Sequence, residues 1–438
     1  MSLPLQDILH LLSLLTTNAV MNQITKIKGF TDLWWPEVAK YTRMEDTARS
    51  VFTRYGYQEL RVPVLEKTEL FARSIGEETD IVQKEMFTFP DRKGRLLTLR
   101  PEATAGVARA YLQATSLSKE QVTKVFTFGP MFRYERPQKG RQRQFHQVNA
   151  ELFGSYSPHA DAELIAMLWR YLHELGLANL DLHLNSLGCP RCRPKFTQKL
   201  QTFLAKQNAL DLCPDCQRRK ETNPLRILDC KVPECRHIAE QAPRMSDHLC
   251  EDCRTHFNTV QTILTACDIS YLLNHHLVRG LDYYQRTTFE VVSRDIGAQS
   301  SVAGGGRYDG LLEQLGGSSA PGIGFACGME RLAMLLERPH ARQPEFYLAV
   351  LDQSALDLGQ ILALNLRRHG LHGEVSFEAK GPKAQLRLAN KLGVLYCLLL
   401  GKEEMETNTI VLKDMNSGVQ QRVTQSSLIE ALKPALGL

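Results

Sequence analysis

The clustering of cysteines constrains the fold more than any other feature of the chain, because eight of eleven fall between Cys189 and Cys253. Within this stretch, helical pieces are interleaved with cysteines and basic residues, whereas strand-rich sequence precedes it and resumes at about residue 271. We therefore expect residues 189–260 to be an inserted helical domain that divides a strand-rich core into two parts, 21–188 and 261–338.

The cysteines of this insertion have the spacing of metal ligands. Three Cys-x-x-Cys pairs and a looser fourth pair comprise Cys189, Cys192, Cys213, Cys216, Cys230, Cys235, Cys250 and Cys253. In a chain without an export signal, such clustering favours metal binding or reduced thiols over disulfides. The spacing is that of tetrahedral Zn²⁺ sites and predicts a structural zinc site. The alternative, a set of reduced thiols without metal, stays open.

Length and composition indicate a globular protein of two or three domains. The chain has 438 residues, of which 43% are hydrophobic. It contains no run of 18 apolar residues, so no membrane span is predicted. The net charge of +5 permits an anionic partner without requiring one. Residues 1–20 lack the basic start of a signal peptide and the arginines of a mitochondrial presequence. We interpret them as an extension of unknown role and expect a cytoplasmic protein.

Hydrophobic periodicity outlines the elements on either side of the insertion. The predicted helices cover 40–56 and 161–175, and the predicted strands cover 59–65, 96–99 and 124–128. Pro63 indicates an edge or interface position for the first strand. Pro101 and Glu102 are typical of the first turn of a helix that begins near Arg100.

The last part of the chain predicts a separate small α/β domain, residues 345–438, after a linker rich in proline and charge. Strands at 346–351, 375–377, 394–400 and 409–412 alternate with helices at 354–369, 381–393 and 426–436. Three basic residues, Lys383, Arg387 and Lys391, recur every fourth position of one of these helices. Such a stripe is typical of a nucleic-acid contact or of an ordinary solvated face.

Residues 277–290 are dense in directional polar groups, with Arg279, Asp282, Tyr283 and Tyr284 inside six positions. A core segment has little use for so many hydrogen-bonding groups, so the segment predicts a site that holds a small polar molecule. The alternative for the two tyrosines is packing in the core. We expect this for one of the pair, because successive strand residues point to opposite faces.

Residues 132–147 predict a strand that leads into a basic, glycine-containing loop and returns. Alternation places Arg133 and Glu135 on one face, and the planar guanidinium of arginine suits phosphate oxygens. The alternative is a solvated charged hairpin.

Residues 322–337 predict a glycine-rich strand and turn that lead into an amphipathic helix, with Arg331 in its first turns. Glycines allow a flat ligand to approach the backbone closely. No Gly-Lys-Ser/Thr follows, so the segment is not a Walker phosphate-binding loop.

Together these segments resemble the motifs of class II aminoacyl-tRNA synthetases. The segment at Arg133 is similar to motif 2, residues 322–337 to motif 3, and the region around Pro63 to motif 1, the dimer-interface strand. Leu-Val-Arg-Gly-Leu-Asp-Tyr-Tyr from Leu277 and Ala-Gly-Gly-Gly-Arg-Tyr-Asp-Gly-Leu from Ala303 resemble signatures of histidyl-tRNA synthetases. The resemblance covers about residues 21–438. It implies an α+β fold with an antiparallel sheet flanked by helices, a C-terminal anticodon-binding domain and a homodimer.

The resemblance also implies an activity, in which L-histidine and ATP form histidyl-adenylate and pyrophosphate before histidine passes to the 3′ end of tRNA-His. It implies Mg²⁺ on the triphosphate, because two arginines leave much of its charge uncompensated. The implied catalytic residues are Arg279 and Arg133. The implied histidine-binding residues are Glu102, Thr104, Gln147, Glu151, Arg279, Tyr283 and Tyr284, and the implied ATP-binding residues are Arg133, Glu135 and Arg331. The implied tRNA-binding residues are Gln138, Lys139, Arg141, Lys383, Arg387 and Lys391.

Two other functions remain as alternatives. One is a non-catalytic regulatory paralogue that partners ATP phosphoribosyltransferase in histidine biosynthesis. Such paralogues typically lose synthetase motif residues and the C-terminal domain, whereas Arg133, Gln147, Arg279 and Arg331 are all present here. The other is a zinc-stabilised nucleic-acid-binding module without catalysis, which would explain only the insertion.

Overall fold

A computed structural model describes residues 24–77, 79–114, 122–208, 211–297, 300–337 and 343–432. The chain divides into two compact units, residues 1–339 and 340–438. The predicted extension, residues 1–20, lies outside the described residues. Among the described helices, none combines the length and the apolar character needed to cross a membrane.

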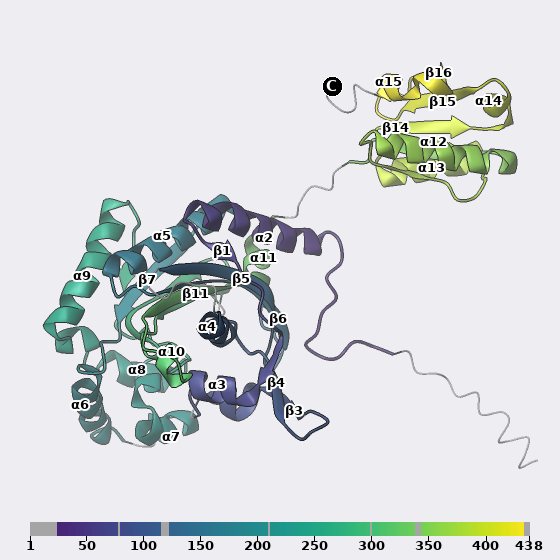
Figure 1. The fold of residues 1–438 in the computed structure, drawn as a ribbon. Coiled ribbons are helices and arrows are strands. Elements are labelled where there is room, and N and C mark those ends of the chain that lie inside the picture. Colours follow the sequence, from purple (N-terminus) through teal and green to yellow (C-terminus); the bar gives the residue numbers. More distant parts are fainter. Residues whose placement is uncertain are drawn as a thin grey trace, which may run out of the picture. The chain divides into compact units, whose positions relative to one another are not determined.

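An eight-stranded, largely antiparallel sheet forms the centre of the first unit (Figure 1). Its strands, in spatial order, are β1 (Gln58–Glu59), β5 (Thr123–Phe132), β6 (Gln144–Phe153), β11 (Gly322–Gly328), β10 (Ser301–Arg307), β9 (Gln285–Ser293), β7 (Leu180–Ser186) and β8 (Leu272–Leu273). Only the outermost pairs, β1 with β5 and β7 with β8, are parallel. The predicted antiparallel α+β fold is confirmed.

Helices α2 (Glu37–Arg54), α5 (Pro158–Glu174), α9 (Glu251–Ala266) and α11 (Met329–Leu335) contribute to one large core with the sheet. On α2, Met44, Ala48, Val51 and Phe52 recur at helical spacing and are fully buried. The ring of Phe52 lies 5.7 Å from that of Phe325 on β11. Gly56 follows α2 with φ +80°, a conformation that favours glycine and ends the helix.

A second core contains α4 (Thr104–Gln113), α10 (Leu311–Gln314) and the insertion. The insertion contains α6 (Arg193–Ala205), α7 (Pro214–Thr222), α8 (Pro233–Glu240) and the short 3-10 helices η3 (Pro224–Ile227) and η4 (Met245–His248). It leads into α9, whose second half packs into the main core through Val260 and Leu264. The predicted limit at residue 260 therefore falls inside a continuous helix.

The single strand predicted over 59–65 is interrupted. Residues 58–59 form β1 at the edge of the large sheet, whereas β2 (Leu65–Lys67) joins a separate sheet in the order β2-β4-β3, with β4 (Leu96–Leu99) and β3 (Phe87–Pro90). Pro63 lies between the two pieces, because proline lacks an N–H for a continuous ladder. Helix α3 (Thr68–Ile75) and a π-helical turn, η1 (Ile81–Glu85), connect β2 to β3.

The second unit is an α/β domain with sheet order β13-β12-β14-β15-β16. Its strands are β12 (Phe346–Val350), β13 (Gly373–Val375), β14 (Tyr396–Leu400), β15 (Thr409–Asp414) and β16 (Gln420–Thr424). Its helices are α12 (Leu356–Arg368), α13 (Pro382–Leu392), α14 (Lys402–Glu406) and α15 (Leu428–Leu432), with 3-10 turns η6 (Gln353–Ala355) and η7 (Gln425–Ser427). The sequence prediction missed α14 and β16, since α14 is short and β16 is almost wholly exposed.

Candidate active site

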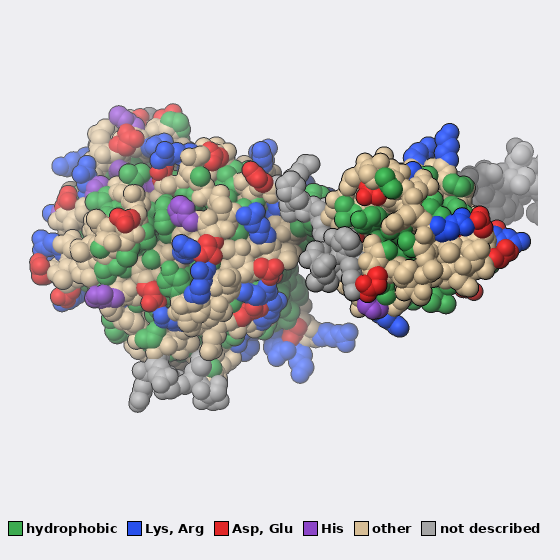
Figure 2. Space-filling model, turned by 90° about the horizontal axis from the view of Figure 1, so that it is seen from above, with side chains coloured by type: hydrophobic (Ala, Val, Ile, Leu, Met, Phe, Trp, Pro, Cys, Tyr) green, Lys and Arg blue, Asp and Glu red, His purple; other side chains and the backbone are tan. Residues whose placement is uncertain are grey.

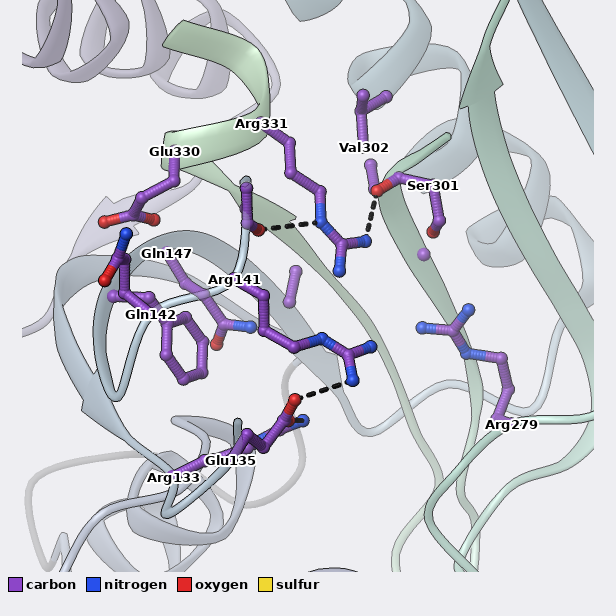
Figure 3. Close-up of a pocket in the computed structure, with 16 residues that line it drawn as sticks. Arg133, Glu135, Arg141, Gln142, Gln147, Arg279, Ser301, Val302, Glu330 and Arg331 are labelled. Carbon is purple, nitrogen blue, oxygen red and sulfur yellow. Dashed lines mark hydrogen bonds and ion pairs between the residues drawn. The ribbon is translucent and has the colours of Figure 1, made fainter. Parts of the chain in front are cut away.

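A cavity of about 190 Å³ lies where the β5–β6 loop meets β10, β11 and α11 (Figure 3). Four arginines and two glutamates line it: Arg133, Arg141, Arg279, Arg331, Glu135 and Glu330. The wall also includes Gln147 and backbone at Gly304 and Gly328. Segments almost 200 residues apart in the chain therefore surround one space that is strongly positive.

Arg133 and Glu135 lie after the end of β5 at Phe132, whereas the alternation argument assumed that the strand continues to Glu135. Arg133 donates from Nε to the carbonyl of Pro101 at 2.9 Å, which fixes the guanidinium at the cavity wall. Glu135 lies 3.9 Å from Arg133 and 2.7 Å from Arg141. The carboxylate thus holds two guanidinium groups toward the same space (Figure 3).

Arg331 enters the cavity from the first turn of α11 (Figure 3). It donates from Nη1 to the carbonyl of Ser301 at 2.5 Å and from Nε to the carbonyl of Gly140 at 3.3 Å. Burial lowers the pKa of Arg331, and the nearby positive charge of Arg141 adds to this effect. An anionic ligand would relieve that repulsion, which is what a phosphate-binding site requires.

Arg279 faces the cavity from the segment that precedes β9, and Glu290 on β9 accepts its hydrogen bond at 3.0 Å. Burial opposes the charge of Arg279, but Glu290 and Tyr284 outweigh burial and raise its pKa. The guanidinium lies flat against Gly304: a Cβ at that position would stand 2.4 Å from Nη1 of Arg279. Gly304 is therefore required for the close approach of Arg279 to β10.

Replacing Gly304 by alanine is expected to reduce the activity of this site at least tenfold while changing the melting temperature by less than about 2 °C. The added methyl group would meet the movable end of Arg279 and displace it from the cavity. Gly328→Ala is the matched control, because a Cβ there meets only Arg331 Cδ at 3.9 Å. Steady-state kinetics and thermal unfolding of both variants test this, and equal activity in the two would contradict it.

Two buried carboxylates lie beside the cavity without lining it. Glu102 accepts hydrogen bonds from the backbone N–H groups of Thr104 and Ala105, at 2.6 and 2.8 Å, and so caps α4. Thr104 donates its hydroxyl to Glu151 at 2.7 Å, and Tyr308 also donates to Glu151. Burial, with the nearby Glu102, raises the pKa of Glu151 to about 8 against those hydrogen bonds. Burial also raises the pKa of Glu102. The positive charge of Arg133 opposes this rise at Glu102 but does not offset it.

Tyr283 and Tyr284 are both buried, with ring centroids 4.6 Å apart. Core packing, expected for one of the pair, holds for both, because the two residues precede β9 and the strand alternation does not apply. Both rings gather with Tyr308. Nearby on β6, the Oε1 atom of Gln147 is buried without a hydrogen-bond partner among the described residues. A buried amide oxygen of this kind points to a missing donor.

Asp282, which precedes the two tyrosines, does not line the cavity. It accepts a hydrogen bond from Asn223 of the insertion at 2.9 Å, and its backbone N–H bonds to Ile75 at the end of α3. Asp282 therefore connects the insertion to the first part of the unit.

The predicted tRNA-binding residues lie in two places. Gln138 and Lys139 are exposed at the tip of the β5–β6 loop, while Arg141 turns back into the cavity. Lys383, Arg387 and Lys391 are exposed along α13, and among the described residues none takes part in an ion pair. Elsewhere charges of both signs are interspersed, as on the face shown in Figure 2.

Sequence reasoning missed three residues that the structure connects to the site. Glu290 pairs with Arg279, Tyr308 donates to Glu151, and Glu330 accepts from the backbone and ring of His146 at 2.9 and 3.0 Å. Each lies inside a sequence segment already singled out. The signal that could have found them was their nearness in the sequence to Arg279, Arg307 or Arg331.

Comparisons with known proteins agree with this geometry. Residues 29–332 match the family model described as histidyl-tRNA synthetase, and residues 345–434 match an anticodon binding domain. The histidine–tRNA ligase of Nitratidesulfovibrio vulgaris (strain DP4) is 58% identical over 95% of this chain and 100% of its own length. That of Maridesulfovibrio salexigens is 59% identical over 92% and 98%.

Solved structures show the same fold. The apo histidyl-tRNA synthetase of S. aureus aligns with a TM-score of 0.76 at 33% identity, covering 94% of this chain and 100% of that one. A Bacillus halodurans protein titled an ATP phosphoribosyltransferase regulatory subunit/histidyl-tRNA synthetase aligns with a TM-score of 0.63 at 18% identity, over 86% and 98%. The second likeness shows the fold alone.

An antiparallel sheet with arginines from motifs 2 and 3 around one cavity, followed by an anticodon-binding domain, defines a class II aminoacyl-tRNA synthetase. The matches extend over nearly the whole chain. The chain belongs to the histidyl-tRNA synthetase family.

Proposed function

We propose that this protein is a histidine–tRNA ligase, which activates L-histidine with ATP and transfers it to the 3′ end of tRNA-His. The observation that carries the proposal is the position of the arginine-lined cavity beside a buried pair of carboxylates, Glu102 and Glu151, with raised pKa values. The first fits a triphosphate and the second fits an amino acid.

In the first step, a carboxylate oxygen of histidine attacks the α-phosphorus of ATP, and the bond to the pyrophosphate oxygen breaks. The carboxylate is already a nucleophile, so the obstacle is the repulsion between two anions. Arg133 and Arg279, on opposite sides of the cavity, would neutralise the charge at the α-phosphorus, and Arg331 would hold the far phosphates. Glu135, which orients Arg133 and Arg141, would lie near the adenine.

The buried carboxylates fit the α-ammonium of the substrate. Glu102 and Glu151, connected through Thr104, both have a raised pKa because of burial, which Arg133 offsets only in part at Glu102. A bound ammonium would supply further positive charge beside them. Gln147, with its unpaired buried oxygen, would accept from the same group.

The aromatic pair supplies the other half of histidine recognition. The Tyr283 and Tyr284 hydroxyl groups lie in a buried cluster and would hydrogen-bond the imidazole nitrogens. A pocket that hydrogen-bonds both ring nitrogens discriminates against apolar side chains of the same size by large factors.

Mg²⁺ is the expected companion of ATP. The cavity holds four arginines against two glutamates, which leaves part of the triphosphate charge uncompensated. The carboxylate oxygens within the cavity belong to Glu135 and Glu330, and hard oxygen donors suit Mg²⁺. When bound, the ion neutralises phosphate charge and orients the leaving pyrophosphate.

Pyrophosphate exchange into ATP, measured with each of the twenty amino acids in turn, tests the proposal. Exchange that depends on histidine alone is expected. Absence of exchange with histidine would reject the ligase and favour the non-catalytic regulatory paralogue.

Contacts with tRNA are proposed for the loop tip (Gln138, Lys139 and Arg141) and for the exposed stripe of α13. Replacing Lys383, Arg387 and Lys391 together by alanine is expected to weaken tRNA binding and to reduce its salt slope by about one per side chain. Pyrophosphate exchange, which needs no tRNA, should not change. Arg368→Ala, an exposed arginine on α12, is the control. Unchanged aminoacylation kinetics in the triple variant would show that α13 is merely solvated.

A homodimer is also proposed. The small sheet β2-β4-β3, next to the motif 1 region, exposes Leu65, Phe89 and Leu96. The register places Leu65 and Phe89 on one face of this sheet, and exposed apolar side chains on one face are typical of protein interfaces. Light scattering should give twice the chain mass of 49.5 kDa, and a monomer at micromolar concentration would contradict the proposal.

A further inference from the structure

The eight cysteines of the insertion gather into two separate groups of four. One group, the outer tetrad, contains Cys189, Cys192, Cys250 and Cys253, and the other, the inner tetrad, contains Cys213, Cys216, Cys230 and Cys235. In each tetrad the sulfur atoms all lie within 4.8 Å of one another. The pairs are nested, so the first Cys-x-x-Cys pair meets the last, across about 60 residues of chain.

The sulfur–sulfur distances fit a tetrahedral metal site and not disulfides. Zn–S bonds of about 2.3 Å place tetrahedral sulfurs about 3.8 Å apart, whereas a disulfide has S–S near 2.05 Å. Cys189 Sγ lies 3.6 Å from that of Cys192 and 3.8 Å from that of Cys250. In the inner tetrad, Cys213 and Cys230 are 3.9 Å apart. All eight side chains are free thiols.

Backbone amides are aimed at two of these sulfurs. The N–H of Cys250 donates to Cys192 Sγ at 3.1 Å, and the N–H of Cys213 donates to Cys235 Sγ at 3.2 Å. Such bonds stabilise thiolates and orient metal ligands. Without an ion, four thiols with only weak donors and acceptors would gain little from this convergence.

We propose that each tetrad binds one Zn²⁺, so that the chain carries two structural zinc ions. Four thiolate ligands complete a tetrahedral shell and leave no open position for substrate or water, which makes both sites structural. Five of the eight cysteines are buried and the other three are half-buried. The sites are therefore closed within the insertion.

The outer zinc joins the two ends of the insertion. Cys189 and Cys192 follow directly after β7, and Cys250 and Cys253 begin α9, which runs back into the main core. An ion at this place would fix where the insertion leaves and re-enters the catalytic unit. Its loss is expected to destabilise the insertion as a whole.

The inner zinc supports a wall of the catalytic unit. It would hold α7 against η3 and α8, and this segment contacts the unit through Arg219 to Asp80 at 2.8 Å and Asn223 to Asp282 at 2.9 Å. Arg219 and Asn223 line a second cavity together with Arg133. An effect of the inner zinc on the KM for a substrate rests on the proposed function, whereas the predicted zinc content is independent of that function.

Elemental analysis of the full-length protein, purified with reductant and without chelator, is the direct test. Two zinc ions per chain are expected. Cys192→Ser and Cys216→Ser should each retain one zinc after dialysis against a competing chelator, and the double variant none. Cys267→Ser, which changes an exposed cysteine outside both tetrads, should retain two. Zinc near zero in the wild-type protein, or iron in its place, would overturn the proposal.

Cobalt substitution of the wild-type protein keeps the test independent of variant folding. Two equivalents of Co²⁺ should give the visible ligand-field bands and the thiolate charge-transfer bands of tetrahedral tetrathiolate cobalt. Absence of these bands would reject the sites. The histidine-dependent exchange reaction is measured on the same sample, so that loss of the metal proposal and loss of the ligase proposal can be told apart.

Discussion

Replacing Arg279 by alanine is expected to lower the rate of adenylate formation about 100- to 1000-fold while ATP affinity changes far less. Arg279 faces the cavity opposite Arg133 and is held by Glu290 at 3.0 Å. A charge placed where negative charge develops acts mainly in the transition state and contributes little to ground-state binding. Single-turnover rates and ATP dissociation constants measure the two effects separately.

The controls for Arg279 separate charge from geometry. Arg279→Lys keeps the charge but loses the planar fork and should recover only part of the rate. Glu290→Gln leaves Arg279 in place with a weaker partner and should cause a smaller loss. Arg331→Ala should mainly weaken ATP binding. Equal losses of rate and affinity in Arg279→Ala would show that Arg279 holds only the ground state.

Replacing Arg307 by alanine is expected to reduce the free energy of unfolding by about 3–5 kcal/mol. Arg307 on β10 and Asp161 on α5 are both fully buried and form an ion pair, and His256 on α9 lies 2.8 Å from the same carboxylate. The variant would leave Asp161 buried beside a single partner. Trp34, Trp35 and Trp169 all belong to the first unit, so urea titration followed by tryptophan fluorescence reports on this unit alone.

Arg294→Ala is the matched control, because Arg294 pairs with Asp181 at the surface. Loss of this surface ion pair should lower the free energy of unfolding by less than about 1 kcal/mol. Asp161→Ala should lower the free energy of unfolding much less in the Arg307→Ala background than in the wild-type protein, because the two residues share one interaction. Additive losses would contradict the coupling.

The Arg307–Asp161 pair also predicts how stability depends on pH. Burial would raise the pKa of Asp161, but His256 and Arg307 outweigh burial and hold its pKa below the usual range. Since the folded pKa lies below the unfolded one, the stabilisation is present at neutral pH. It is lost as pH falls through the unfolded and then the folded pKa. The free energy of unfolding of Arg307→Ala should therefore fall less steeply with decreasing pH than that of the wild-type protein.

Much of the site could be predicted because its residues lie in short segments with strong local patterns. Arg133 and Glu135 come from one loop, and Arg331 from one helix start. The structure places all three around the same cavity. Core packing was expected for one of Tyr283 and Tyr284 and is found for both, because the two residues precede β9 and strand alternation does not separate them. The interruption at Pro63 was signalled by the proline but not by the hydrophobic alternation around it.

The sequence by itself determined the kinds of groups present and the family to which the chain belongs, because motif residues and their spacing are local properties. Only the tertiary structure decided which distant groups meet. It brings Glu290 to Arg279, buries Glu102 and Glu151 together beside the cavity, and sorts eight cysteines into two nested tetrads. These contacts depend on sheet register and on helix packing between segments that are far apart in the chain, and no local pattern encodes either.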